Sequence, residues 1–444
     1  MSIDRRVFLT QSARLMGGGL SAFAALQVMG CDRSPPHASA AGYGPLEEAG
    51  PELALPSGFR YRIIGVRGSL MSDGRATPPL HDGMAAFPLP NGNVRLIRNH
   101  EVGNPAAAGA ALGDPARAYD PLAGGGTTSL EIDPETREVV RDFLSLSGTL
   151  RNCAGGPTPW RSWITCEEDF RDQRQGYQRR HGYVFDVPVS AERDVPADPL
   201  PALGRFVHEA VAVDPSTGIV YQTEDQGQAG FYRFVPDGPY QSGQRPNLSS
   251  GRLQMLAVRD RPRYDTGSGQ VSGVTLPATW VGVPDPDPAG TSVEADAVFR
   301  QGWDQGAARF ARIEGCWHEN GAIYCSCTNG GDAELGQIWR HRPGPEGGDL
   351  TLVFESPHRD VLKHPDNICS TPKGAIVLCE DASGSCLIRG LTREGEVFDF
   401  ARNIASDSEF AGATFSPDGH TLFVNLQATG QTVAIWGPWE RGPF

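Results

Sequence analysis

The amino-acid sequence predicts an all-β protein, a six-bladed β-propeller with loop insertions that cap one face. The first observation is a hairpin pattern that recurs six times between residues 81 and 427. The second is an abundance of turn-forming residues, with 55 glycines and 36 prolines in 444 residues. The third is that no long amphipathic helical pattern follows the N-terminal segment. Hairpins repeated every several tens of residues are typical of propellers, in which each repeat contributes one blade.

The clearest copy of the hairpin spans residues 208–225. Two short β-branched strands flank a Pro-Ser-Thr-Gly turn. Glu209 begins the first strand, and the pair Glu224 and Asp225 ends the second. In an antiparallel hairpin the start of one strand lies beside the end of the other, so these carboxylates are expected at one end. The other copies span residues 81–101, 152–169, 313–329, 365–381 and 409–427. Because radial repetition points equivalent positions toward one axis, we expect their first residues to form a ring.

The first 40 residues are predicted to be a twin-arginine signal peptide. Arg5 and Arg6 precede an apolar run over residues 15–29 that is too short for a stable membrane anchor. Residues 28–31 resemble a lipoprotein cleavage box, which would leave Cys31 lipidated and the protein anchored to a membrane. Residues 38–40, Ala-Ser-Ala, suit ordinary signal peptidase, and we favour this cut. We therefore expect the twin-arginine export machinery as a partner and a periplasmic or secreted location.

Residues 41–444 are predicted to form a single propeller domain. A strand is expected over residues 59–66, and the C-terminal residues 434–439 are expected to close the last blade against it. The longest gap between hairpins, about residues 236–305, is interpreted as an insertion that covers a blade or caps the mouth. Short strands are expected within it at 253–258 and 279–283.

The formal charge of −14 argues against nucleic acid or an anionic membrane as the main partner. The acidity has two explanations, solubility of an exported protein or attraction of cations.

Most of the cysteines lie in apolar strand patterns, where the role of a small buried hydrophobic residue is the commoner one. Cys153 differs, since it occupies the position that other hairpins give to acids.

Potential metal ligands occur at both ends of the repeated hairpins. The first strands begin with Asp82, Cys153, Glu209, Glu314, Asp366 and Glu409. The second strands end with Glu101, Glu168, Asp225 and Asp381. Like charges this close need compensation, and Ca²⁺ accepts many carboxylate oxygens. A thiolate adds a soft ligand suited to iron or zinc. The alternative is that the acids only serve turns and strand ends.

These residues resemble the PhoX-type alkaline phosphatase family. The resemblance rests on the twin-arginine signal, Asn-His-Glu at 99–101, Asn-Cys-Ala-Gly-Gly-Pro-Thr-Pro-Trp at 152–160, Cys-Glu-Glu at 166–168 and His-Glu-Ala at 208–210. It covers nearly the whole mature chain. It implies a six-bladed propeller with an axial cluster of iron and calcium that hydrolyses phosphomonoesters.

The resemblance also implies roles for single residues. Cys153, Glu209 and Glu314 would be iron ligands, and Asp366 with the nearby acids would bind iron or calcium. Arg312 would hold the substrate phosphate, with Asn99 as a second phosphate contact. The segment Glu-Gly-Cys-Trp at 314–317 departs from the family pattern, in which an acidic residue follows the glutamate. We therefore expect a divergent branch of the family.

The predicted function is a secreted, metal-dependent phosphatase that acts as a monomer on a small phosphorylated substrate. Clustered cations and one arginine can stabilise the charge on a phosphoryl group, so no serine nucleophile is required. The sequence has no Gly-x-Ser-x-Gly motif. Two other classes remain open. A calcium-dependent propeller hydrolase of phosphodiesters or lactones would use the same ring without Cys153 or Arg312, and a non-catalytic propeller would bind a partner at its mouth.

Overall fold

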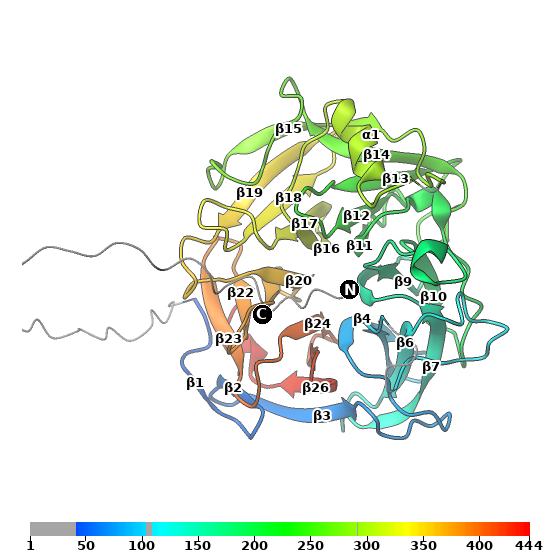
Figure 1. The fold of residues 1–444 in the computed structure, drawn as a ribbon. Coiled ribbons are helices and arrows are strands. Elements are labelled where there is room, and N and C mark those ends of the chain that lie inside the picture. The colour runs from blue at the N-terminus through cyan, green and yellow to red at the C-terminus, as the bar shows by residue number, and fades with distance from the viewer. Residues whose placement is uncertain (1–40, 104–108, 291) are drawn as a thin grey trace, which may run out of the picture. The chain divides into compact units, whose positions relative to one another are not determined.

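The protein's structure, a computed structural model, describes residues 41–103, 109–290 and 292–444. Within these residues, five antiparallel β-sheets are arranged around a centre (Figure 1). The same residues contain one α-helix and three short 3-10 helices, α1 (Ala297–Asp304), η1 (Gln173–Gln175), η2 (Pro201–Leu203) and η3 (Trp439–Arg441). The fold is all-β and propeller-like, as the sequence predicts. No helix of the described segments is long and apolar enough to cross a membrane. The predicted signal peptide at 1–40, with Cys31, lies outside the described residues.

Six hairpins of the described chain supply the strands nearest the centre. They pair β4 (His81–Pro88) with β5 (Val94–His100), β8 (Asn152–Pro157) with β9 (Ser162–Glu167), β11 (His208–Val213) with β12 (Val220–Glu224), β16 (Ile313–Glu319) with β17 (Ala322–Cys327), β20 (Pro365–Ser370) with β21 (Ile376–Glu380) and β24 (Phe410–Phe415) with β25 (Leu422–Leu426). In Figure 1, β4, β11, β16, β20 and β24 lie closest to the centre. The six hairpins predicted from the sequence are therefore all present.

Further strands extend each hairpin outward. The sheets run β4-β5-β6-β7, β8-β9-β10, β11-β12-β13-β14-β15-β19-β18-β17-β16, β20-β21-β22-β23-β2-β1 and β24-β25-β26-β3. The outer strands are β1 (Leu46–Glu48), β2 (Leu53–Pro56), β3 (Arg60–Val66), β6 (Gly125–Ile132), β7 (Val139–Thr149), β10 (Val184–Pro188), β13 (Tyr232–Pro236), β14 (Gly251–Val258), β15 (Thr275–Gly282), β18 (Gln337–Arg342), β19 (Asp349–Glu355), β22 (Leu387–Leu391), β23 (Val397–Asn403) and β26 (Gln431–Trp436).

The segment predicted as an insertion, about 236–305, contributes two of these strands. β14 pairs along β13 and so belongs to the sheet of its own hairpin. β15 pairs with β14 on one side and, over residues 275–277, with β19 on the other. The segment therefore extends and joins two strand units, in addition to providing loops.

The last sheet contains strands from both ends of the chain. β26 near the C-terminus pairs with β3 near the N-terminus over six register positions, from Gln431↔Val66 to Trp436↔Arg60. This confirms the predicted closure. Aromatic packing supports it, because the rings of Phe59 and Trp439 lie 4.7 Å apart and are both buried. Each buried aromatic of this kind stabilises the fold by about 1.5–3 kcal/mol.

The core also contains a neutral histidine. His341 of β18 packs against Tyr221, Phe231 and Trp280, with ring centroids 5.4–6.2 Å apart. Its Nδ1 lies 3.1 Å from the carbonyl oxygen of Asp349, and its Nε2 has no partner among the described residues. Burial in this apolar cluster lowers the pKa of His341 to about 4.

We expect His341→Asn to make unfolding less sensitive to acid. The folded-state pKa lies below the unfolded value of about 6.5, so the unfolded chain takes up the proton first as the pH falls. The neutral His341 ring contributes on the order of 3 kcal/mol to the free energy of unfolding above about pH 6.5, and this contribution is lost as the pH falls toward 4. Urea unfolding from pH 7 to 4 should show the stability gap between variant and wild type closing. His358→Asn, at an exposed histidine, is the control. A difference in the free energy of unfolding between wild type and His341→Asn that stays constant with pH contradicts the prediction.

Candidate metal centre

The first strands of the six hairpins share a register shift near their start. Strand pairing skips two residues in each of them, at 82–83, 153–154, 209–210, 314–315, 366–367 and 412–413. Such β-bulges leave residues unpaired and re-aim their side chains. The first bulge residue is a potential ligand in five hairpins: Asp82, Cys153, Glu209, Glu314 and Asp366. The structure thus places these five predicted ligands at equivalent positions.

The sixth hairpin differs from the prediction. Its bulge begins at Gly412, three residues after Glu409, so Glu409 is not equivalent to the other five residues. Gly412 has a φ of +62°, and a Cβ there would lie 2.4 Å from the carbonyl oxygen of Asp82. Close packing of β24 on β4 therefore excludes a side chain at this position. Glu409 still reaches the ring, because its carboxyl group hydrogen-bonds that of Asp381.

A second repeated contact fixes the ends of the second strands. The residue after each second strand donates its backbone N–H to the carbonyl of the residue before the first strand, over 2.9–3.2 Å. The donors are Glu101, Glu168, Asp225, Thr328, Asp381 and Gln427, and the acceptors are Leu80, Arg151, Val207, Arg312, His364 and Glu409. The four acids predicted at these ends therefore share one register.

Two arginines and one glutamine bind this acidic cluster, which we call the ring acids: Asp82, Glu101, Glu168, Glu209, Asp225, Glu314, Asp366, Asp381 and Glu409. Arg151 forms ion pairs with Glu101, at 2.5 Å, and with Glu168. Arg312 donates to Asp225 over 2.8 and 3.2 Å and pairs with Glu314. Gln427 bridges the carboxylates of Asp82 and Glu101 over 3.0 and 2.8 Å. Within the described chain, these two arginines are the basic side chains that pair with ring acids.

The donor set fits a cation cluster. A ligand atom of each of Cys153, Glu168 and Glu209 lies within 4.8 Å of the other two. Burial, followed by the charges of Glu209 and Glu168, holds the pKa of the Cys153 thiol well above its usual range. Burial and neighbouring carboxylates likewise raise the pKa values of five ring acids, Asp82, Glu168, Glu209, Glu314 and Asp366. The pKa of Asp366 rises to about 7. Bound cations would reverse these shifts by stabilising the ionised forms.

Comparison with known proteins identifies the family. The sequence matches the family Alkaline phosphatase PhoX over residues 41–142 and 134–430. This chain belongs to the PhoX family. It is therefore a phosphatase, an enzyme of the hydrolase class.

A solved PhoX structure has a similar fold. Pseudomonas fluorescens PhoX in complex with vanadate, a transition state analogue, gives a TM-score of 0.67 at 17% identity, over 90% of this chain and 98% of that chain. A gluconolactonase, XC5397 from Xanthomonas campestris, gives a TM-score of 0.42 at 12% identity, over 88% of this chain and 99% of that chain. A comparison with curated protein sequences finds no match.

In this PhoX chain, side chains on the second strands hold the bulges of the next hairpin. The acceptor in each case is the carbonyl oxygen of the first bulge residue. The contacts are Asn99 Nδ2 to Cys153 (3.1 Å), Thr223 Oγ1 to Glu314 (2.5 Å), Ser326 Oγ to Asp366 (2.6 Å) and Asn425 Nδ2 to Asp82 (2.5 Å). Four of the five ligand-bearing bulges are thus tied to a neighbouring hairpin by a hydrogen bond, which is buried in three of them and partly buried at Asp366.

Asn99, the residue predicted as a second phosphate contact, makes four hydrogen bonds to the next hairpin. Its Nδ2 also donates to the carbonyl of Ala154, over 2.7 Å, and its Oδ1 accepts hydrogen bonds from Trp163 and Thr165, both over 2.9 Å. The side chain is fully buried. Both amide hydrogens and the amide oxygen are therefore occupied in holding the Cys153 bulge and the β9 strand.

We expect Thr223→Val to lower the free energy of unfolding by about 1–3 kcal/mol, because the buried N–H of Ala210 and carbonyl of Glu314 lose their partner. Valine has nearly the same shape, so packing is retained. Retention of metal should also weaken, since the Glu314 backbone is no longer held. Urea unfolding and metal content measure the two effects. Thr275→Val, on an exposed part of β15, is the matched control, and equal effects of the two changes would contradict the prediction.

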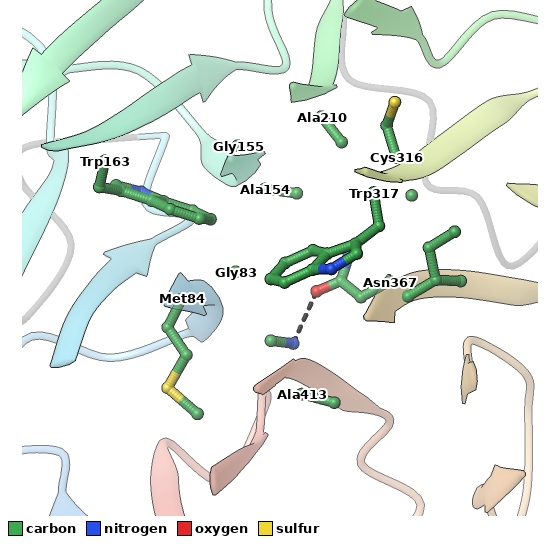
Figure 2. Close-up of a pocket in the computed structure, with 13 residues that line it drawn as sticks. Gly83, Met84, Ala154, Gly155, Trp163, Ala210, Cys316, Trp317, Asn367 and Ala413 are labelled. Carbon is green, nitrogen blue, oxygen red and sulfur yellow. Dashed lines mark hydrogen bonds between the residues drawn. The ribbon is translucent and has the colours of Figure 1, made fainter. Parts of the chain in front are cut away.

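Next to the ring, the axis is nearly filled. Figure 2 shows the indole of Trp317 between small residues of neighbouring strands, and its Nε1 donates to Ser370 Oγ over 3.0 Å. A Cβ at Gly83 would lie 2.6 Å from Ala154 Cα, and one at Gly315 would lie 2.4 Å from the Asp366 carbonyl oxygen. Glycine at these bulges therefore permits the close approach of the inner strands. The cavity lined by Gly83, Ala154, Gly315 and Trp317 has a volume of about 20 Å³, which is room for about one water molecule.

Proposed function

We propose that this PhoX-family chain is an exported phosphomonoesterase with a cluster of iron and calcium ions at the axis of a six-bladed propeller. The observation that carries the proposal is the convergence of one thiol, nine carboxyl groups and two arginines at one level of six repeated hairpins. A cluster of this charge and composition suits hard cations together with one softer ion. The family match supplies the phosphatase chemistry.

The strand pairing supports six blades. The nine-stranded sheet contains two four-stranded units, β11-β12-β13-β14 and β16-β17-β18-β19, which β15 joins at their outer edges. With the other four sheets, this makes six units, each led by one of the six hairpins.

The ring residues divide by chemistry into two groups. Cys153, with Glu168 and Glu209 beside it, would hold iron, and Glu314 would complete this group. Five of the remaining six acids would hold calcium or share iron: Asp82, Glu101, Asp225, Asp366 and Asp381. When bound, the ions would supply Lewis-acid stabilisation to the phosphoryl oxygens.

Arg312 would bind the substrate phosphate. Its side chain is 31% exposed, and Asp225 holds it in place. The planar guanidinium can donate to two phosphate oxygens at once. Because Arg312 lies among the ring acids, the substrate would approach from their side of the propeller.

Export in the folded state suits this chain. All eight cysteines of the described segments are buried and free. A chain that folds before it enters an oxidising compartment keeps such thiols out of disulfides. We propose the twin-arginine route, cleavage after residue 40 with lipidation of Cys31 as the alternative, and a monomeric enzyme.

One set of assays tests the proposed function. Protein obtained by its own export route should contain iron and calcium and should hydrolyse a phosphomonoester faster than a phosphodiester or a lactone. Preference for a phosphodiester or lactone would assign the other hydrolase class. Absence of both metal and turnover would leave a binding propeller.

A further inference from the structure

Arg151 occupies the same place in its hairpin as Arg312 does in another. Each residue directly precedes a first strand, β8 or β16, and each has a left-handed backbone, with φ of +50° and +46°. Each carbonyl accepts the hydrogen bond that closes the hairpin end, from Glu168 at 3.0 Å and from Thr328 at 2.9 Å. The other four equivalent positions carry no arginine, as they are Leu80, Val207, His364 and Glu409.

The two side chains also have matching partners. Each arginine pairs with the acid that ends the preceding hairpin, Arg151 with Glu101 at 2.5 Å and Arg312 with Asp225 at 2.8 Å. Each pairs with one more acid of its own hairpin, Glu168 or Glu314. Their exposed fractions are 36% and 31%. The two guanidinium groups therefore present the same chemistry at the same level of the ring.

The hairpin between these two arginines carries Glu209. Arg151 lies two residues before Cys153 and contacts Glu168, so it borders one side of the Cys153, Glu168 and Glu209 group. Arg312 contacts Glu314 on the next hairpin beyond Glu209. An anion held at this group would have one guanidinium on each side.

We propose that Arg151 is a second phosphate-binding residue, which contacts the phosphoryl group from the side of Glu209 opposite to Arg312. The inference rests on the proposed function. A phosphoryl group has three non-bridging oxygens, which two guanidinium groups and a cation can share. Cations bound by Glu101 and Glu168 would compensate those carboxylates, so the donors of Arg151 become available to the substrate. The competing role is that of a counter-ion that only neutralises Glu101 and Glu168.

Binding of inorganic phosphate to metal-loaded protein separates the two roles. By calorimetry, Arg151→Gln should raise the Kd for phosphate about 10- to 100-fold, the loss expected for a charge-assisted hydrogen bond, at unchanged metal content per chain. Arg151→Lys should recover part of the affinity, because it keeps the charge without the planar fork. Arg309→Gln is the matched control, since Arg309 is 32% exposed and pairs with Asp265 outside the ring acids at 3.0 Å. It should bind phosphate like the wild type.

The opposite result is equally clear. Unchanged phosphate affinity in Arg151→Gln, with lower metal content or thermal stability, makes Arg151 a counter-ion and overturns the inference. If Arg151→Gln cannot be loaded with metal, Arg151→Lys decides, and wild-type phosphate affinity in that variant overturns the inference too. Failure of the proposed function looks different, because the wild type itself would then neither bind phosphate nor hydrolyse a phosphomonoester.

Discussion

Arg312→Lys is expected to cost about 2–4 kcal/mol of transition-state stabilisation in the hydrolysis of a phosphomonoester. Lysine keeps the positive charge but offers a point donor in place of a planar fork, so it cannot grip two phosphoryl oxygens together. The loss should appear in kcat/KM at unchanged metal content. Turnover and bound metal should be measured on one preparation, so that the rate is expressed per loaded site.

A purely structural role of Arg312 predicts another pattern. The ion pairs with Asp225 and Glu314 would weaken, and thermal stability or metal content would fall. Turnover per bound cluster would then be nearly unchanged, which would remove Arg312 from the substrate site. Arg309→Lys, three residues earlier and outside the ring acids, controls for general effects of replacing an arginine in this segment.

Cys153→Ser is expected to remove most of the bound iron while calcium and the fold are largely retained. The thiol is buried, and its Sγ lies 3.5 Å from the carbonyl oxygen of His208, a contact that a serine hydroxyl can also make. A hydroxyl does not ionise as a thiol does, so the soft ligand is lost and the remaining iron should become more sensitive to pH. Metal analysis across a pH series measures both effects.

The control for this variant is a cysteine with a packing role. Cys369→Ser changes a fully buried cysteine of the core between the last two sheets and should reduce stability without a selective loss of iron. If Cys153→Ser keeps its iron, Cys153 has the same role as Cys369, that of a small buried hydrophobic residue.

Much of the candidate site could be predicted because its signals are local. A turn motif and an acid at a strand end lie within about twenty residues, so Glu209 and Asp225 could be placed together from one hairpin alone. Repetition then extended the argument to Asp82 and Asp381. Arg151 was not predicted from the sequence, although it stands two residues before Cys153, just as Arg312 stands two residues before Glu314. Comparison of the hairpins position by position would have found it.

The contact between Arg312 and Glu314 depends on two local departures from a regular strand. On a regular strand, residues two apart would share a face. Arg312 instead precedes β16 with a left-handed backbone, and Glu314 lies in a bulge. The two deviations together bring the side chains into contact.

The sequence by itself determined the class of fold, the six hairpins and the ligand types at their ends, because turn chemistry and strand periodicity act between neighbouring residues. Tertiary structure alone decided which bulge each side chain supports. Asn425 holds the carbonyl of Asp82 across 343 positions, and Thr223 holds that of Glu314 across 91. It also decided that Gly412 fills the sixth ring position and that β15 joins two strand units. These contacts depend on the packing of whole hairpins against one another, and such packing leaves no periodic signal in either partner's own sequence.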